Sequence, residues 1–349
     1  MVWARANELP GLVARPWLVL VVTFSPGCWG SPQSTDPIDA GTPPSCRAEG
    51  PGRTDCGASL ESCCTSLLVK GGSYDRTYAT DGSVPTGQTD PATVSDFRLD
   101  KYDVTVGRFR QFVTAWSGGS GFVPAPGSGK HTQLNGGLGL ANSAAPGGYE
   151  TGWDAADDIH VQPTPGNLGS CGYDEWTDAP GSQEALPMNC VDWYEAYAFC
   201  IFDDGFLPSE AEWEYAAAGG SQQRQYPWGS TAPGAGNEYA VYNCQYPSDA
   251  QSCSDTSNIA PVGTATLGQG LWGQLDLAGN MSQWILDWWA SPYGNPCTDC
   301  ANLTLSSERV LRGGYFGSNA ASYMRSTYRD FDVPTDRYFA SGFRCARRP

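Results

Sequence analysis

Histidine is scarce in this chain: its 349 residues include only two, His131 and His160. Catalytic proton transfer near neutral pH and metal binding both rely heavily on histidine, so this scarcity narrows the chemistry open to the chain. A facial metal triad would need both histidines and a carboxylate. Isolated histidines in an irregular stretch are more often exposed, and we expect this here. The sequence contains no Gly-x-Ser-x-Gly elbow and no partnered histidine, so nothing in it indicates a Ser/His/Asp hydrolase.

Positive charge is also scarce. Lysine and arginine number 20 against 37 aspartates and glutamates, which gives a net charge of −17 and a pI near 4.4. Phosphate backbones and anionic lipid surfaces repel such a protein. We therefore expect no nucleic-acid partner, and membrane attachment only through a lipid anchor. Cations are the natural partners of this charge.

The N-terminal apolar run is short. Trp17-Leu-Val-Leu-Val-Val-Thr-Phe24 falls far below the roughly 20 residues of a membrane-spanning helix. With Arg5 and Arg15 before it, the run is typical of an export signal, and we expect a signal peptide over residues 1–27. Ser25-Pro-Gly-Cys28 then resembles a lipoprotein cleavage site with Cys28 as the lipidated residue. Ordinary signal cleavage nearby is the alternative.

Cysteine is plentiful and odd in number, with 13 residues. If Cys28 carries lipid, the others can form six disulfides, which fits an exported, oxidising location. Cys46, Cys56, Cys63 and Cys64 form a compact cluster. Adjacent cysteines cannot easily bond to each other, so Cys63 and Cys64 should each reach back to one of the earlier pair. A metal site is the alternative for this cluster.

Glycine and proline, with 43 and 26 residues, favour turns and loops over long helices. Alternating polarity predicts a strand that begins at Phe97, and helical spacing follows over residues 105–116. A second helix is predicted over residues 191–201. Residues 117–180 have little periodicity and predict a long irregular surface insertion, where binding residues can occur.

A third helix is predicted over residues 209–218. Ser209 is its expected N-cap, Glu212 completes a capping box, and the two glycines that follow end it. Glu210, Glu212 and Glu214 look like paired catalytic carboxylates, but capping and helix-surface roles explain them better.

Several uncommon segments occur in one order along the chain. They are Pro187-Met-Asn-Cys-Val-Asp-Trp-Tyr194, Leu207-Pro-Ser-Glu-Ala-Glu-Trp-Glu-Tyr215, Tyr226-Pro-Trp-Gly229, Asp276-Leu-Ala-Gly-Asn280, Arg309-Val-Leu-Arg-Gly-Gly314 and Gly342-Phe-Arg-Cys-Ala-Arg347. From about residue 68 to 347 they resemble the sulfatase-modifying-factor domain of formylglycine-generating enzymes. The resemblance implies an α+β, C-type-lectin-like fold with few helices, short strands and long irregular loops over residues 67–349. Residues 28–66 would be a lipoprotein-type tether and a Cys-rich segment.

Four disulfides are expected in this domain. The resemblance implies one between the second helix and the C-terminus. Two further bonds close short loops, and each would stabilise the folded state by roughly a few kcal/mol on the loop-entropy model. A Cys-x-x-Cys segment has the spacing of a redox dithiol, but no helix signal follows it, so we expect a structural bond. The pairs are Cys200 with Cys345, Cys171 with Cys190, Cys244 with Cys253, and Cys297 with Cys300.

The family's reactive residues are missing. Formylglycine-generating enzymes oxidise a sulfatase cysteine with copper held by two cysteines, which suit soft Cu(I). The resemblance places that pair after the Arg-Gly-Gly motif, where residues 312–325 contain no cysteine. Ser318 and Tyr323 stand at the matching positions, Tyr315 replaces a serine, and Asn319 replaces a histidine. Copper is therefore not expected.

Structural calcium is the cofactor that the resemblance still implies, because calcium favours a ring of oxygen ligands. The expected ligands of a first site are the side chains of Asp276 and Gln283 and the carbonyls of Gly279 and Met281. Gln283 replaces a usual glutamate, which lowers the charge of the site. A less regular second site would involve Asn243, Cys244 and Asp255. A hydrogen-bonded turn without an ion is the alternative.

The missing thiolates favour a non-catalytic binding or scaffold protein at the bacterial cell envelope. We expect an exported monomer, either an outer-membrane lipoprotein or a secreted protein, that binds a peptide, protein or glycan. The residues expected to bind this ligand are aromatic, amide and cationic: Tyr315, Asn319, Tyr323, Arg325 and Arg329. Packing and internal ion pairing are the alternative roles for them. Two other hypotheses are a formylglycine-generating oxidase and an unrecognised enzyme that uses the 117–180 insertion.

Overall fold

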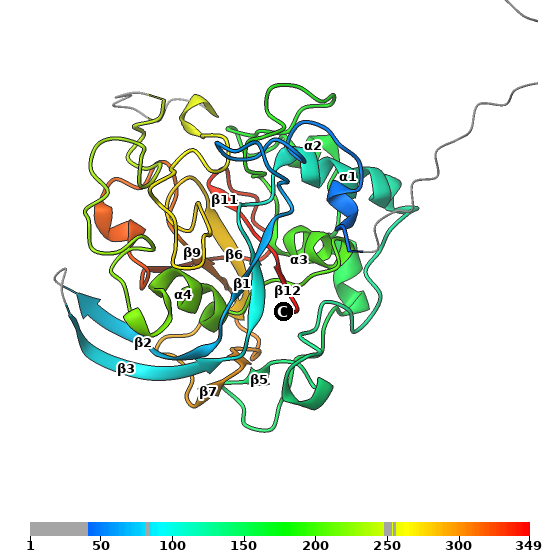
Figure 1. The fold of residues 1–349 in the computed structure, drawn as a ribbon. Helices are drawn as coiled ribbons and strands as arrows, with labels where there is room; N and C mark the ends of the chain where they lie inside the picture. The colour runs from blue at the N-terminus through cyan, green and yellow to red at the C-terminus, as the bar shows by residue number, and fades with distance from the viewer. Residues whose placement is uncertain (1–40, 81–83, 248–252, 254–255) are drawn as a thin grey trace, which may run out of the picture. The chain divides into compact units, whose positions relative to one another are not determined.

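Short elements joined by long loops make up the computed structural model, which describes residues 41–80, 84–247, 253 and 256–349 (Figure 1). The described helices are α1 (Val106–Trp116), α2 (Pro165–Leu168), α3 (Trp193–Phe202) and α4 (Glu210–Ala218). The described strands are β1 (Ser66–Val69), β2 (Gly72–Thr80), β3 (Pro85–Val94), β4 (Phe97–Asp100), β5 (Ala141–Asn142), β6 (Ser282–Trp288), β7 (Cys297–Thr298), β8 (Cys300–Ala301), β9 (Arg309–Arg312), β10 (Arg329–Asp332), β11 (Ser341–Gly342) and β12 (Ala346–Arg347). The predicted α+β fold with few helices and short strands is confirmed.

Local sequence signals set the ends of the helices. The side chain of Thr105 caps α1 by accepting from the Arg108 N–H. The predicted capping box of α4 is present between Ser209 and Glu212, and Gly219 ends the helix in the left-handed conformation with φ 64°. All three predicted helices are confirmed to within about two residues, which is the usual uncertainty of helix boundaries.

The sheets join distant parts of the chain. β4 lies between β1 and β12, so the start of the domain pairs with its end. A four-stranded sheet has the order β10-β9-β6-β11, in which β9 is antiparallel to both neighbours. The β2–β3 hairpin forms the long ribbon at the lower left of Figure 1. The four-stranded sheet matters most here, because the candidate site follows β9.

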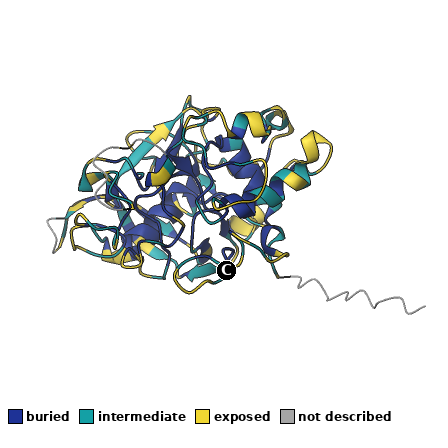
Figure 2. Cartoon of the chain, turned by 90° about the horizontal axis from the view of Figure 1, so that it is seen from above, coloured by how far each residue is buried: buried dark blue, intermediate teal, exposed yellow. Residues whose placement is uncertain are grey.

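Two large hydrophobic clusters fill the described unit. One packs α1 against α3, where the rings of Phe109 and Phe199 stack with centroids 5.6 Å apart. The other surrounds α4 and buries Trp213 and Ala216 completely. Figure 2 shows this buried interior in dark blue beneath exposed loops. Each large buried apolar side chain contributes about 1.5–3 kcal/mol of transfer free energy.

The twelve described cysteines form six disulfides. The four bonds predicted within the domain are all present. In the N-terminal cluster Cys46 pairs with Cys64 and Cys56 with Cys63, so each adjacent cysteine reaches back as expected. Because these sulfurs are bonded to each other, the alternative of a metal site in this cluster is wrong.

The Cys-rich segment packs against the domain that was predicted to begin at residue 67. Arg108 of α1 donates from Nε to Ser45 Oγ at 3.1 Å and from Nη1 to the Cys63 carbonyl at 3.1 Å. The Ser45 N–H donates to Asp203 at 2.8 Å. Residues 44–66 therefore belong to the same compact unit as the rest of the domain. The predicted signal peptide and Cys28 lie outside the described residues and stay predictions.

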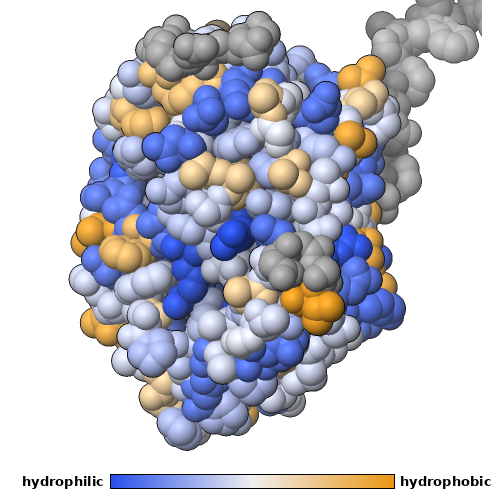
Figure 3. Space-filling view, turned by 90° about the vertical axis from the view of Figure 1, so that its left-hand side faces the viewer, coloured by the Kyte–Doolittle hydropathy of each residue, from blue (hydrophilic) through white to orange (hydrophobic). Residues whose placement is uncertain are grey.

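Within the described ranges, no helix has both the length and the apolar character needed to cross a membrane. The face in Figure 3 is mostly hydrophilic, and its apolar residues gather in small separate groups. Extended apolar patches mark many protein–protein interfaces. The described residues of this face form none.

Candidate functional site

A tight turn after β9 shapes the candidate site. Gly313 and Gly314 have φ of 96° and 66°, which a side chain would strain. A Cβ on Gly314 would also lie 2.9 Å from the Tyr323 carbonyl oxygen. This turn brings the loop from Tyr315 back against the segment of Tyr323. The two halves of the predicted ligand site therefore face each other across one hollow.

This hollow, the Tyr323 cavity, has a volume of about 320 Å³. It is lined by Gly314, Tyr315, Gly317, Ser318, Asn319, Tyr323, Tyr328 and Asp330. The structure thus brings together Tyr315, Asn319 and Tyr323 of the predicted ligand residues. Tyr328 and Asp330 were missed, because no motif distinguishes them in the sequence.

Ser318 and Tyr323, at the two positions that the resemblance assigns to copper-binding cysteines, both carry hydroxyl groups. Ser318 is 5% exposed, and its Oγ accepts from the Tyr315 N–H at 3.0 Å. The Tyr323 ring lies edge-on to Tyr328, with centroids 5.0 Å apart. Hydroxyl oxygens are hard ligands, and the Ser318 hydroxyl already stabilises its own turn. These residues do not fit soft Cu(I).

A disulfide forms part of the wall beside this cavity. A Cβ on Gly317 would lie 3.2 Å from Cys253 Sγ, which is bonded to Cys244. The N–H groups of Asn243 and Cys244 donate to the carbonyls of Ser318 at 2.9 Å and Phe316 at 2.8 Å. These two hydrogen bonds hold the backbone of residues 316–318 in place. The sequence predicted the disulfide but gave no sign that it lies at the site.

The two predicted ligand-binding arginines do not line the cavity. Arg329 donates from Nε and Nη2 to Glu210 at 2.6 and 2.7 Å, and its guanidinium packs over Tyr293. Its assignment as a ligand residue is wrong, because this guanidinium neutralises a buried carboxylate. Arg325 is exposed and lies outside the lining. The described lining therefore carries one acidic side chain, Asp330, and no cation.

The helix-surface role expected for the glutamates of α4 is also wrong, since all three are buried. Glu210 pairs with Arg329, and Glu214 pairs with Arg312 at 2.8 Å. Burial raises the pKa of Glu214 to about 7, although Arg312 opposes the shift. α4 is enclosed by neighbouring elements, so no face of it is free. The capping role predicted for Glu212 is confirmed.

The expectation that both histidines are exposed is wrong for His131. Its ring is completely buried, with Nδ1 3.0 Å from Glu150 and Nε2 3.2 Å from Glu212. Burial opposes the charged form, but the two carboxylates raise the pKa of His131 to about 10. His160 instead stacks on Tyr194, with ring centroids 4.3 Å apart. Over the described residues no cluster of histidine, cysteine and carboxylates is arranged to hold a metal.

The first predicted calcium site does not fit an ion. Gln283 Oε1 accepts from Trp213 Nε1 and from Arg344 Nε, both at 2.7 Å. The Asp276 carbonyl accepts from the Arg344 guanidinium at 2.8 Å. A guanidinium therefore occupies the position where Gln283 was expected to hold calcium, and it would repel a cation. Met281 is completely buried, and the Gly279 N–H donates to the Gly313 carbonyl at 2.9 Å.

The second calcium site stays a prediction. Asn243 and Cys244 both have positive φ, of 53° and 55°. The Cys244 carbonyl faces Asn258 Nδ2 at 3.4 Å. Asp255, the third predicted ligand, lies outside the described residues.

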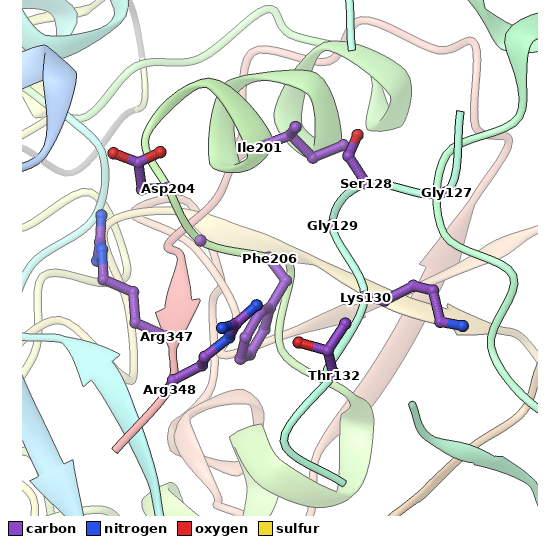
Figure 4. A pocket seen from close by; sticks show the side chains of 11 residues that line it. Gly127, Ser128, Gly129, Lys130, Thr132, Ile201, Asp204, Phe206, Arg347 and Arg348 are labelled. Carbon is purple, nitrogen blue, oxygen red and sulfur yellow. The ribbon is translucent and has the colours of Figure 1, made fainter. Parts of the chain in front are cut away.

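A larger cavity of about 550 Å³ lies elsewhere in the unit (Figure 4). Lys130, Arg347 and Arg348 line it together with Phe206 and the end of α3. Arg347 forms ion pairs with Asp100 and Asp203, so its charge is already compensated. No predicted site residue lines this cavity.

Comparisons with known protein families and structures agree with the observed fold. A family model described as sulfatase-modifying factor enzyme 1-like domain matches residues 54–349. A formylglycine-generating enzyme of Thermomonospora curvata is 29% identical over 293 residues, which cover 80% of this chain and 90% of that relative. The inactive C-alpha-formylglycine-generating enzyme 2 of Mus musculus is 32% identical over 165 residues, which cover 46% of this chain and 49% of that relative.

A solved structure shows the same fold. PvdO from Pseudomonas aeruginosa superimposes with a TM-score of 0.51 at 22% identity, over 86% of this chain and 100% of that one. Curated relatives include both enzymes and inactive proteins, so membership alone does not decide catalysis. The chain belongs to the sulfatase-modifying factor enzyme 1-like domain family and has its C-type-lectin-like fold.

Proposed function

We propose that this chain is a non-catalytic binding protein of the cell envelope and that its ligand occupies the Tyr323 cavity. The observation that carries the proposal is the pair Ser318 and Tyr323 at the positions of the family's copper-binding cysteines. Neither side chain supplies a thiolate, and Ser318 Oγ is engaged by the Tyr315 N–H. A relative named as inactive gives a precedent within the family.

The lining indicates a ligand that forms hydrogen bonds. Three tyrosines combine flat apolar rings with hydroxyl groups, and Asn319 adds an amide donor and acceptor. The Tyr328 hydroxyl donates to Asp330 at 3.0 Å, which orients that carboxylate. A volume of about 320 Å³ is at the small end of ligand sites. We infer a short peptide segment or one to two sugar units.

The disulfides and the N-terminal apolar run support export to the cell envelope. Six disulfides form and persist in oxidising compartments and are rare in the cytosol. The apolar run before Cys28 fits a signal peptide, and lipidation of Cys28 would anchor the protein. Labelling with a palmitate analogue, lost in Cys28→Ser, tests the anchor.

The ligand class is tested with peptide and glycan arrays probed by the purified chain. Asn319→Ala and Tyr323→Ala should each lower the affinity for the selected ligand by about tenfold or more, which is the loss expected for a central contact. Arg325→Ala is the matched control, because Arg325 is exposed and outside the cavity. Thermal melting should confirm that all three variants fold.

Two outcomes of the array experiment would contradict the proposed site. If a ligand binds both cavity variants with the same affinity as the parent chain, its binding site lies elsewhere. If a ligand is lost in Arg325→Ala but still binds Tyr323→Ala, Arg325 is the ligand contact and the Tyr323 cavity is not.

A further inference from the structure

The Tyr323 cavity combines three aromatic rings with one carboxylate. The rings belong to Tyr315, Tyr323 and Tyr328, and the carboxylate belongs to Asp330. The rings of Tyr323 and Tyr328 are nearly perpendicular, at 86°, with centroids 5.0 Å apart. The face of an aromatic ring carries partial negative charge, so tyrosines around a small cavity attract a cation. Among the lining residues that the structure describes there is no lysine or arginine, so this attraction is available to a ligand.

The carboxylate of Asp330 forms no ion pair in the described part of the chain. Its Oδ2 accepts from the Tyr328 hydroxyl at 3.0 Å, and its Oδ1 accepts from the Phe331 N–H at 2.9 Å. The next residue, Arg329, points away and pairs with Glu210. The two hydrogen bonds orient the carboxylate, and neither removes its charge. A cation in the cavity would supply the missing partner.

Two further carboxylates extend the negative charge beyond the cavity. Asp332 follows on β10, and Asp336 lies in the turn beyond, where its N–H donates to the Val333 carbonyl at 2.9 Å. Neither aspartate forms an ion pair with another described residue. Burial raises the pKa of Asp332, and Asp336 and Asp330 raise it further, although the Val333 N–H opposes the shift. This uncompensated charge favours a ligand with several positive charges, such as a basic peptide, over a single amino sugar.

The hydrogen bonds of Asp330 favour an ammonium over a guanidinium. A guanidinium binds a carboxylate best through two parallel hydrogen bonds, one to each oxygen. Each oxygen of Asp330 already accepts one hydrogen bond from the protein, which hinders that arrangement. An ammonium is a compact charge that needs only one oxygen. The amide of Asn319 and the tyrosine hydroxyls in the same lining supply acceptors for its other N–H groups.

We infer that the Tyr323 cavity binds the side-chain ammonium of a lysine in a basic peptide, with the ammonium against Asp330 and the methylene chain against the tyrosine rings. The volume of the cavity is at the small end of ligand sites, which suits one side chain of a longer ligand. This inference rests on the proposed function, because it names the chemical group that the same cavity takes.

The test is titration of the purified chain with a tripeptide that has a central lysine and capped ends, followed by calorimetry. Acetylation of the lysine Nζ removes its charge, and a central norleucine removes the ammonium. Both altered peptides should bind at least about tenfold more weakly. A central arginine should also bind more weakly than lysine, because its fork competes with the two hydrogen bonds that Asp330 already accepts.

Variants of the chain locate the lysine peptide. Asp330→Asn removes the charge and keeps the shape, so it should lower the affinity by about tenfold or more. Tyr323→Leu should lower it by about threefold or more, while Tyr323→Phe keeps the ring and should retain it within about twofold. Asp178→Asn is the matched control, because it removes the same charge from an exposed residue outside the cavity. Thermal melting should confirm that all four variants fold.

Several results would overturn this inference. The ammonium is wrong if the acetylated, norleucine or arginine peptide binds as tightly as the lysine peptide. An amino sugar is the better ligand if D-glucosamine binds more tightly than the lysine peptide. Equal loss in Asp330→Asn and Asp178→Asn would show a general charge effect. If a ligand from the arrays depends on Tyr323 but carries no ammonium, the inference alone fails. If neither that ligand nor the lysine peptide depends on Tyr323, the proposed site fails as well.

Discussion

Single residues show how this protein keeps charge in its interior. His131 lies between Glu150 and Glu212 and is completely buried. Its pKa is raised to about 10 in the folded protein, against about 6.5 in an unfolded chain. The proton is therefore bound more tightly by the folded state. The stability that it contributes is fully present below about pH 6.5 and is lost as the pH rises to about 10.

This charge predicts a pH-dependent stability. From pH 8 to 10 the free energy of unfolding of the parent chain should fall with pH, by up to about 1.4 kcal/mol per unit from this proton. His131→Gln should lose this part of the slope. His160→Gln should retain it, because that ring stacks on Tyr194. Urea denaturation across this range measures the slopes, and identical slopes for the parent chain and His131→Gln would contradict the ion pair.

At the scale of helices and strands, the predictions that succeeded are those that depend on neighbouring residues in the sequence. The caps of α4 depend on residues within one turn of each other, so Ser209, Glu212 and Gly219 could be identified directly. The partners of Glu210 and Glu214 come from β9 and β10, about a hundred residues later in the chain. No local pattern shows such a pairing. The burial of those glutamates could therefore not be predicted.

The candidate site was predicted in part for a similar reason. The glycine turn and family segment identified Tyr315, Asn319 and Tyr323. The start of β10 was not recognised as a strand, and side chains on a strand alternate between its faces. Tyr328 and Asp330 therefore line the cavity, while Arg329 between them points to Glu210. If this strand had been predicted, Tyr328 and Asp330 would have been assigned to the candidate site in place of Arg329.

The capping box predicts the effect of one substitution in α4. Ser209→Ala removes the acceptor for the Glu212 N–H and a bond to the Glu212 carboxylate. It should lower the free energy of unfolding by about 1–2 kcal/mol. Ser307→Ala, at an exposed serine, should change it by less than about 0.5 kcal/mol. Equal effects in chemical denaturation would show that the cap is not important.

The whole molecule retains its family's scaffold, although residues 312–325 contain no cysteine. Cys200 and Cys345, 145 residues apart, hold α3 to the C-terminal segment, and β12 pairs with β4 near the domain's start. None of these contacts depends on a reactive thiol. The scaffold therefore does not require a thiol at Ser318 or Tyr323. In this fold, structure and chemistry rest on different residues.

Copper binding and oxygen consumption test the central proposal most directly. The purified chain is loaded with Cu(I), bound metal per chain is determined, and oxygen uptake is followed with a cysteine-containing sulfatase peptide. The Ser318→Cys, Tyr323→Cys double variant is the matched comparison and should gain copper. The non-catalytic proposal predicts no stoichiometric copper and no peptide oxidation by the parent chain. One copper per parent chain, with oxygen uptake and conversion of the peptide cysteine, would contradict it.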